Sequence, residues 1–459
     1  MCGIVGIYGV SEASKYIYFG LYALQHRGQE GAGIACFDGK KIRNYKNIGL
    51  VSEVFNERIL LELPGEIAIG HVRYSTTGSS TLQNVQPFCV TFSKKTLALA
   101  HNGNLVNAHT LRCELEEEGH IFQTTTDSEI IMHLIVKYLK EGLVNAISKT
   151  MRKIKGAYSV VLLCDNVLVA FRDPLGFRPL SLGMINGGYA LASETCAFDL
   201  LGVEYLRDIA PGEILVIDEN GPKSYFPFER GQQPLAHCIF EFIYFARPDS
   251  LIFQKNVYSV RKNLGFNLYK ECPLSADFVM PFPDSGTYAA LGYAQASGIP
   301  LEFGVIRNHY IGRTFIQPSE KLRDLSVKMK LNPVKDFIRG KEVIVIDDSL
   351  VRGTTSKNRI ISIKLAGAKR IHFLISCPPL RYPCFFGIDF PSAKELIAAK
   401  HSVEEIRKFL DIDTLYYLSL EGLLDSVGEL RDKVCLACFT GNYPVEVDFS
   451  FKKDITEIN

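Results

Sequence analysis

The sequence predicts an α/β protein of two domains, a mixed α+β domain followed by a domain with a parallel sheet. Its 459 residues exceed the usual size of a single domain and leave room for two or three. A stretch rich in turn-forming residues, 218–236, divides the chain into two parts. After this junction, two apolar strands each lead through a polar loop into a helix, which is the pattern of a parallel sheet.

Composition and charge narrow the class of protein. Lysine plus arginine (51) nearly balance aspartate plus glutamate (50), so no overall basic field indicates a nucleic-acid partner. The chain has no run of about 18 apolar residues and no secretory signal, so we expect a cytoplasmic protein without a membrane partner. Twelve cysteines in such a chain do not indicate a disulfide framework. We expect seven of them to be buried core thiols: Cys36, Cys89, Cys113, Cys164, Cys196, Cys272 and Cys377.

The N-terminal residues offer the first candidate for catalysis. Cys2 directly follows Met1, and it is small enough for the methionine to be removed. Its thiol and its free α-amino group would then supply a nucleophile and a base from one residue. We expect maturation to need only removal of Met1. The alternative is an ordinary buried thiol, which is how most free cysteines behave.

The first part of the chain alternates strands with helices and carries polar groups at strand ends. A helix is predicted over 12–25, with strands at 34–37, 67–70 and 97–100. Three further candidates follow such elements: Arg73, the pair Asn102 and Gly103, and Asp127. Each has a structural alternative. The arginine could form a surface ion pair, Asn-Gly is a common turn, and the aspartate is the expected cap of a helix over 128–139.

Five segments in this order, MCGIVGI, HRGQEGAG, GHVRYSTTG, HNGN and TTTDSE, resemble the N-terminal-nucleophile glutaminase domain of the class II glutamine amidotransferases. The resemblance implies an αββα sandwich over residues 2–230, in which Cys2 attacks the side-chain amide of glutamine. It also implies that Arg73 binds the glutamine α-carboxylate and Asp127 its α-amino group. Asn102 and the backbone N–H of Gly103 would form the oxyanion hole, and water would then hydrolyse the thioester.

The second domain, 235–459, carries two polar loops after apolar strands. In the second loop, Asp347 and Asp348 follow the strand 343–346, and carboxylates in this position can bind ribose hydroxyls and Mg²⁺. Gly353, Thr354 and Thr355 can offer N–H groups and hydroxyls to a phosphate at a helix N-terminus. The loop lacks Gly-Lys-Thr, so it does not encode nucleoside triphosphate hydrolysis. The structural alternative is that the two acids cap a helix.

This loop resembles the phosphoribosyl pyrophosphate signature of type I phosphoribosyltransferases, and Pro-Asp-Ser-Gly at 283–286 resembles their pyrophosphate loop. Residues 307–318 resemble a loop that closes over the substrate, and a basic tract follows them. The resemblance implies Mg²⁺ at Ser285, Asp347 and Asp348. It assigns substrate binding to Asp284, Ser285, Gly286, Arg313, Asp347, Asp348, Gly353, Thr354 and Thr355.

Taken as a whole, the chain is similar to the amidophosphoribosyltransferase family of purine biosynthesis. The resemblance implies that ammonia from glutamine passes internally to the second site and displaces pyrophosphate from phosphoribosyl pyrophosphate, giving 5-phosphoribosylamine. It further suggests a homotetramer inhibited by purine nucleotides. A glutaminase joined to a sugar isomerase or to an asparagine-forming ligase would share the first domain, but not the Asp347-Asp348 loop. A regulatory protein that only binds nucleotides would not need an intact Cys2.

Four cysteines raise the question of a metal. Cys435 and Cys438 form a CxxC motif, for which buried thiols, zinc and redox chemistry are all open. Together with Cys238 and Cys384 they match positions of the iron–sulfur-containing branch of the family. The resemblance implies a 4Fe-4S cluster in a C-terminal extension, with a structural or oxygen-sensing role, since neither reaction transfers electrons.

Overall fold

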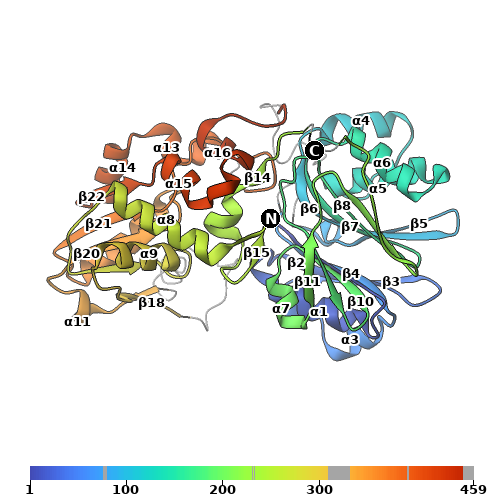
Figure 1. Ribbon diagram of the computed structural model, residues 1–459, viewed down its shortest axis with the longest axis horizontal. Helices are drawn as coiled ribbons and strands as arrows, with labels where there is room; N and C mark the ends of the chain where they lie inside the picture. Colours follow the sequence, from blue (N-terminus) through green and yellow to red (C-terminus); the bar gives the residue numbers. More distant parts are fainter. Residues whose placement is uncertain (76–79, 230, 232, 309–330, 390–391, 448–459) are drawn as a thin grey trace.

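The computed structural model describes residues 1–75, 80–229, 231, 233–308, 331–389 and 392–447. Figure 1 shows two halves side by side, the first from blue to green and the second from yellow to red, with the N-terminus between them. In the part of the chain that the structure describes, no helix is long and apolar enough to cross a membrane. The predicted order, a mixed domain followed by a parallel one, is confirmed.

Among the described residues, the first sheet has seven strands in the order β11-β9-β10-β1-β4-β2-β3. All neighbours are antiparallel, and β1 lies in the middle, with Gly3 opposite Val72 of β4. Cys2 therefore lies at the end of a central strand, one residue before β1 begins. The strands are β1 (Gly3–Tyr8), β2 (Gly31–Phe37), β3 (Ile42–Ile48), β4 (Ile67–Arg73), β9 (Ser181–Ile185), β10 (Gly188–Ala192) and β11 (Glu204–Asp208).

The second sheet, counted over the described ranges, has six antiparallel strands in the order β13-β12-β8-β7-β6-β5. Strand β6 carries Asn102 and Gly103 near its end and pairs with β7 from Leu97 to Leu105. The strands are β5 (Phe88–Phe92), β6 (Lys95–Leu105), β7 (Gly156–Cys164), β8 (Val167–Arg172), β12 (Ile214–Asp218) and β13 (Gly221–Tyr225).

Helices cover the outer face of each sheet, and the two inner faces pack together. Helix α1 packs on the first sheet through Ile17, and α5 and α6 pack on the second through Ile130 and Ile147. The sheets meet through apolar residues such as Ile4 and Val161, each fully buried and each stabilising the fold by about 1.5–3 kcal/mol. The helices are α1 (Ala13–Ala23), α2 (Val51–Val54), α3 (Glu57–Leu61), α4 (Ala108–Glu117), α5 (Asp127–Tyr138), α6 (Leu143–Lys153) and α7 (Cys196–Leu201).

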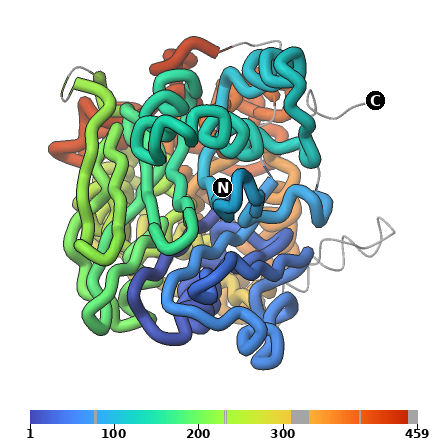
Figure 2. The backbone as a smooth tube through the Cα atoms, turned by 90° about the vertical axis from the view of Figure 1, so that its right-hand side faces the viewer, coloured from blue at the N-terminus to red at the C-terminus, as the bar shows by residue number. Residues whose placement is uncertain are grey.

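These layers form the αββα sandwich that the glutaminase resemblance implied. In Figure 2, which looks onto the first half, the cyan helices α4 to α6 lie above the sheets and the dark blue segment lies below. The sandwich therefore brings the edge of β1 and the end of β6 close together, although about 100 residues separate them in the sequence.

The second half contains, within its described residues, a parallel sheet in the order β17-β20-β21-β22. The strands are β17 (Phe278–Pro281), β20 (Glu342–Asp347), β21 (Arg370–Ile375) and β22 (Thr414–Tyr417). Its main helices are α8 (Val257–Glu271), α9 (Thr287–Ser297), α12 (Thr354–Leu365), α14 (Val403–Leu410) and α15 (Leu420–Val427). Because parallel strands end at the same edge, the loops after β17 and β20 leave the sheet side by side.

Short elements complete the second half. A two-stranded parallel pair, β14 (His237–Cys238) with β23 (Val434–Cys435), joins the start of this half to its C-terminal extension. A π-helical turn, η4 (Glu241–Phe245), follows β14. The remaining elements are β15 (Leu251–Ile252), β16 (Lys255–Asn256), β18 (Val305–Arg307), β19 (Leu331–Pro333), α11 (Lys335–Ile338), α13 (Ile397–Lys400) and α16 (Ala437–Thr440).

Candidate active sites

The first candidate site surrounds Cys2. Its backbone nitrogen donates a hydrogen bond to Asn102 Oδ1 at 3.2 Å, and its thiol points at the carbonyl oxygen of Tyr74, with 3.5 Å between Sγ and oxygen. The residue is buried, with 7% of its surface exposed. The structure thus brings together the thiol and the amide that the resemblance pairs.

Asn102 and Gly103 present hydrogen-bond donors beside this thiol. Asn102 is fully buried, and among the described residues its Nδ2 has no hydrogen-bond acceptor. Buried amides are nearly always paired, so this donor is available to an oxygen that is not part of the fold. Gly103 has a φ of 155°, and a β-carbon there would lie 2.0 Å from the carbonyl oxygen of Ala157. The position therefore requires glycine.

Arg73 and Asp127 are both buried, and neither has the structural role that stood as the alternative to glutamine binding. Arg73 Nη1 donates to the carbonyl oxygen of Asn84 at 2.8 Å, so a surface ion pair is wrong. Burial lowers the pKa of Arg73, and the charges of Cys2 and Asp127 partly restore it. The carboxylate of Asp127 accepts from the backbone N–H of Leu105 at 2.8 Å.

The predicted cap of the following helix is also wrong. Helix α5 begins at Asp127 itself, with Thr126 in the capping position and no side-chain hydrogen bond to the first turn. The aspartate instead reaches across to β6, two residues beyond Gly103. Its carboxylate therefore fixes the strand that carries Asn102, which a helix cap could not do.

A buried network of charges behind Cys2 was missed by the sequence analysis. Arg27 Nε donates to the carbonyl oxygen of Cys2 at 2.9 Å. Its terminal nitrogens donate to the two carboxylate oxygens of Glu241 at 3.0 and 2.9 Å, and also to Glu194. His26 Nε2 lies 2.8 Å from the same Glu194 oxygen. The carbonyl of the candidate nucleophile is thus linked directly to an ionised network.

Charge balance holds this network in its ionised form. Burial alone would lower the pKa of Arg27, but Glu241 and Glu194 raise it well above the ordinary value. Burial alone would raise the pKa of Glu194, but His26 and Arg27 hold it far below its usual range. Both groups therefore stay charged at neutral pH although neither is exposed to solvent.

Arg178 extends the network toward the second domain. Its Nη1 lies 3.3 Å from Glu241 Oε1 and contacts the sulfur of Met1, and its Nε donates to the carbonyl oxygen of Phe386 at 3.1 Å. Two sequence signals were available for this network. Arg27 lies within HRGQEGAG, and Glu241 is an acid inside the apolar run 239–243, where a charge has to be paired.

The second candidate site lies at the ends of β17 and β20. Ser285 Oγ donates to Asp347 Oδ1 at 3.3 Å, and Arg359 Nη1 lies 3.4 Å from Asp347 Oδ2. Both aspartates are buried. Burial, and then the charge of Asp348, raise the pKa of Asp347 well above its ordinary value, while Arg359 opposes the shift. The two neighbouring carboxylates therefore carry an unfavourable concentration of negative charge at the end of β20.

Two glycines shape the loops of this site, and the second of them stands at a helix N-terminus. A β-carbon at Gly286 would lie 2.1 Å from the carbonyl oxygen of Ile346, so the first loop needs glycine to pass the second strand. Helix α12 begins at Thr354, with Gly353 in the capping position at a φ of 79°. The structural alternative, in which the aspartate pair caps this helix, is therefore wrong. Thr354 and Thr355 occupy the first turn, where N–H groups are free of helical partners.

Part of the predicted second site falls outside the described residues. This applies to Arg313, to the basic tract and to all but the first two positions of the predicted closing loop, 307–318. Arg307, which is described, forms an ion pair with Asp284 of the first loop. That contact joins the start of the closing loop to the predicted pyrophosphate loop.

Four cysteines meet in one small cavity of about 20 Å³. Cys238 and Cys435 are paired residues in the two-stranded element of β14 and β23, and Cys384 and Cys438 line the same cavity. Burial is the main cause that raises the pKa of the Cys238 thiol to about 11 and of the Cys435 thiol to about 12, and the other thiols contribute. Over the described ranges, no three or more His, Cys, Asp or Glu side chains are arranged to hold a metal ion.

The other cysteines mostly follow the prediction. All twelve lie among the described residues, and each is a free thiol. The core assignment is confirmed for four of them, whereas Cys89 and Cys272 are only partly buried. It is wrong for Cys113, which lies exposed on the outer face of α4. The buried members of the predicted set are Cys36, Cys164, Cys196 and Cys377.

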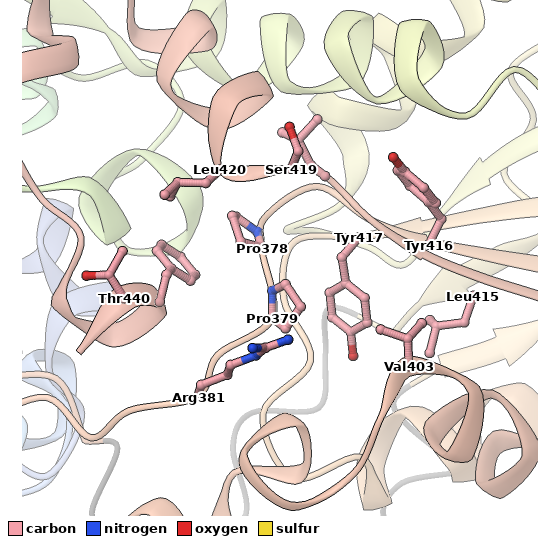
Figure 3. Close-up of a pocket in the computed structure, with 12 residues that line it drawn as sticks. Pro378, Pro379, Arg381, Val403, Leu415, Tyr416, Tyr417, Ser419, Leu420 and Thr440 are labelled. Carbon is pink, nitrogen blue, oxygen red and sulfur yellow. The ribbon is translucent and has the colours of Figure 1, made fainter. Parts of the chain in front are cut away.

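A separate hollow of about 380 Å³ lies in the second half, where Pro378, Pro379 and Arg381 face β22 and the start of α15 (Figure 3). Its walls are mostly apolar, with Tyr417 and Leu420 among them. None of the predicted site residues lines it. Burial raises the pKa of Tyr417 in its wall, but no described titratable group of the predicted sites faces it, and we assign the hollow no chemistry.

Comparison with known proteins covers both halves. Residues 71–199 match the family model described as glutamine amidotransferase domain. The chain is 49% identical to amidophosphoribosyltransferase of Methanocaldococcus jannaschii, covering 98% of each chain. It is 50% identical to the chloroplastic amidophosphoribosyltransferase 1 of Arabidopsis thaliana, over 97% of this chain and 79% of that one. A solved structure of the Bacillus subtilis glutamine phosphoribosylpyrophosphate amidotransferase, complexed with ADP and GMP, has a TM-score of 0.92 at 48% identity, covering 98% of both chains.

Proposed function

This chain belongs to the amidophosphoribosyltransferase family, and we propose how its own residues carry out the two steps of that reaction. It is a glutamine amidotransferase of de novo purine biosynthesis. In the proposed reaction, glutamine is hydrolysed at Cys2, and the ammonia displaces pyrophosphate from phosphoribosyl pyrophosphate to give 5-phosphoribosylamine. The observation that carries the first step is the contact between the Cys2 nitrogen and Asn102 Oδ1.

The thiol of Cys2 is the nucleophile. Once Met1 is removed, the Cys2 nitrogen becomes an α-amino group that can take the thiol proton directly or through one water. The hydrogen bond to Asn102 Oδ1, 3.2 Å long, would hold that amino group in place. The contact between Sγ and the carbonyl oxygen of Tyr74 would fix the direction in which the thiol points.

The oxygen of the attacked amide would be bound by Asn102 Nδ2 and the backbone N–H of Gly103. Support comes from the unpaired, fully buried Nδ2 and from the backbone of Gly103, which no side chain can block. A donor in this position stabilises the developing oxyanion by about 2.7–4 kcal/mol. Arg73 would bind the α-carboxylate of glutamine through its fork of donors, and Asp127 the α-amino group. Both are buried, and Cys2 and Asp127 each lie within electrostatic reach of Arg73.

In the second step, the loops after β17 and β20 would hold phosphoribosyl pyrophosphate. Gly353, Thr354 and Thr355 would bind the 5-phosphate at the N-terminus of α12, and the loop of Asp284, Ser285 and Gly286 would bind pyrophosphate, with Arg313 closing over it. Ammonia has to arrive unprotonated, which favours a dry passage between the two sites.

Mg²⁺ would bind at Ser285, Asp347 and Asp348. The residues fit a divalent cation, because the two buried carboxylates repel each other and the pKa of Asp347 is raised accordingly. Bound Mg²⁺ would neutralise charge on the departing pyrophosphate. The aspartates themselves would accept hydrogen bonds from the ribose hydroxyls.

A 4Fe-4S cluster would bind at Cys238, Cys384, Cys435 and Cys438. The fit rests on the four thiols that line one cavity, and on Arg178, whose positive charge opposes the raised pKa of Cys238. A 4Fe-4S cluster takes one thiolate at each of its four irons, which matches the number of thiols that line this cavity. We assign the cluster no part in either reaction, because neither transfers electrons.

Regulation and assembly are proposed from the relatives. The Bacillus subtilis relative was solved with ADP and GMP, and we propose that purine nucleotides inhibit this chain as well. We also propose a homotetramer, which light scattering of the purified protein would establish or exclude. The free state of all twelve thiols supports a cytoplasmic location.

The coupled reaction can be tested on protein purified without oxygen. Glutamate release from glutamine is measured with and without Mg²⁺ and phosphoribosyl pyrophosphate, together with pyrophosphate release and a Cys2→Ala control. We expect glutamate and pyrophosphate in equal amounts, both lost in the control. Glutamate without pyrophosphate would show that the second site has been misassigned.

A further inference from the structure

Glu241 belongs to the second half of the molecule, yet only the side chain of Arg27 lies between its carboxylate and the backbone of Cys2. It is the first residue of the turn η4 and is completely buried. Its two oxygens accept hydrogen bonds from both terminal nitrogens of Arg27, at 2.9 and 3.0 Å. The remaining nitrogen of Arg27, Nε, donates to the carbonyl oxygen of Cys2 at 2.9 Å. One guanidinium therefore separates the second half from the backbone of Cys2.

This geometry fixes the plane of the guanidinium. A carboxylate that accepts from both terminal nitrogens leaves an arginine no freedom to rotate or slide. Arg27 Nε is consequently aimed at one point, the carbonyl oxygen of Cys2. On the other side of the residue, the Cys2 nitrogen is held by Asn102. The direction of the thiol depends on both anchors, because the side chain leaves the backbone between them.

Glu194 cannot replace Glu241 in this role. It contacts Arg27 through one oxygen, which also faces His26 at 2.8 Å. Its other oxygen accepts from Ser250 Oγ at 2.7 Å and from the backbone N–H of Arg247 at 2.8 Å. Glu194 therefore ties several segments together, whereas Glu241 supplies the paired contact that orients the guanidinium.

We propose that Glu241 is a positioning residue of the glutaminase site, acting through Arg27 on the backbone of Cys2. The second domain would thus complete the first active site with one of its own side chains. The inference rests on the proposed chemistry at Cys2, in which Glu241 has no assigned role. A misplacement of about 1 Å at a reacting group is enough to lower a rate about 100-fold, so loss of this anchor should reduce turnover.

The test compares Glu241→Gln with a matched control, Glu213→Gln. Glu213 is also fully buried and also accepts from both terminal nitrogens of an arginine, Arg207, at 2.8 and 2.7 Å, but it does not touch Cys2 or Arg27. Three measurements are made on each protein. Steady-state kinetics of glutamate release give kcat and KM, and thermal unfolding gives the melting temperature. The pH dependence of Cys2 alkylation by iodoacetamide is followed by mass spectrometry of the Cys2 peptide.

We expect Glu241→Gln to lower kcat about 10- to 100-fold with little change in KM, and to shift the pH profile of Cys2 alkylation. The control should lower the melting temperature while kcat and the alkylation profile stay as in the unchanged protein. If Glu241→Gln alters only the melting temperature, as the control does, Glu241 is a structural residue and the inference is overturned.

A second variant keeps the test decisive if Glu241→Gln does not fold. Arg27→Lys retains the positive charge beside both carboxylates but removes the donor to the carbonyl oxygen of Cys2. We expect the same loss of kcat and the same altered profile. Where both single variants fold, a double variant should be no worse than either one. An unchanged profile in folded Arg27→Lys would overturn the inference. If the unchanged protein releases no glutamate at all, the proposed function fails and not this inference.

Discussion

Asn104 Nδ2 donates a hydrogen bond to the carbonyl oxygen of Phe385 at 3.0 Å, joining strand β6 of the first half to the segment that follows Cys384. Two residues further on, a β-carbon at Gly387 would lie 3.1 Å from the carbonyl carbon and oxygen of Gly103. The strand that carries the proposed oxyanion donors therefore packs against the same segment that carries one of the four clustered cysteines. This contact makes the first prediction possible.

Gly387→Ala should lower glutamine turnover without weakening the binding of phosphoribosyl pyrophosphate. The residue has a φ of 100°, and the added methyl group would press on Gly103, so the proposed oxyanion donor would be displaced. Gly367→Ala is the control, because Gly367 has a φ of 93° in the same half and an added β-carbon there would first meet Arg339, at 3.2 Å. Steady-state kinetics should show a loss of about tenfold in kcat for the first variant only. Equal losses in both would mean that the effect is one of backbone strain alone.

Asn102→Ala should reduce kcat for glutamate release about 100- to 1000-fold, with a smaller effect on KM. The reason is the loss of a buried donor that stabilises the oxyanion only as the amide is attacked. The exposed Asn186, whose side chain bonds to the hydroxyl of Tyr16, serves for comparison, and Asn186→Ala should keep full activity. A variant at position 102 that retained wild-type kcat would remove Asn102 from the oxyanion hole.

Asp347→Asn should stabilise the metal-free protein while abolishing pyrophosphate release. The pKa of Asp347 is raised by burial and by Asp348, so its carboxyl favours the folded state only when protonated. The unchanged protein therefore loses stability as pH rises from about 4, the unfolded pKa of aspartate, up to the raised folded pKa. The difference in the free energy of unfolding between Asp347→Asn and the unchanged protein should grow over that pH range and be absent at lower pH. Melting temperatures of both proteins are measured as a function of pH in the presence of a chelator. A melting temperature of the unchanged protein that rises over this range relative to Asp347→Asn would contradict the prediction.

Cys384→Ala should lower the iron and acid-labile sulfide content of protein purified without oxygen. If the four clustered cysteines each bind one iron, the unchanged chain should carry about four of each, and loss of one thiolate should destabilise the cluster. Cys113→Ala is the matched control, since Cys113 is exposed on helix α4 of the first half and does not line the cavity. Zinc with no sulfide in the unchanged protein would contradict the cluster assignment.

The sequence predicted the elements that depend on local pattern. Apolar alternation and turn residues located the central strands, and the helix over 12–25 differs from α1 by one or two residues at each end. Predictions from local pattern were wrong for residues whose role depends on partners far away in the sequence. Asp127 looks like a helix cap because capping residues are short acids before an apolar helix, but its partner is Leu105, 22 residues away. Cys113 looks like a core thiol although it lies on the exposed face of α4.

By itself, the sequence determined the two-domain α/β architecture and the residue types at both candidate sites, because motifs and apolar periodicity are local properties of a chain. Only the tertiary structure decided which charged groups meet behind the nucleophile. Arg27 and Glu241 stand 214 residues apart, and no spacing rule links them. A buried charge has to find a partner because burial without one is costly, but the identity of that partner depends on how two separately folded halves come together.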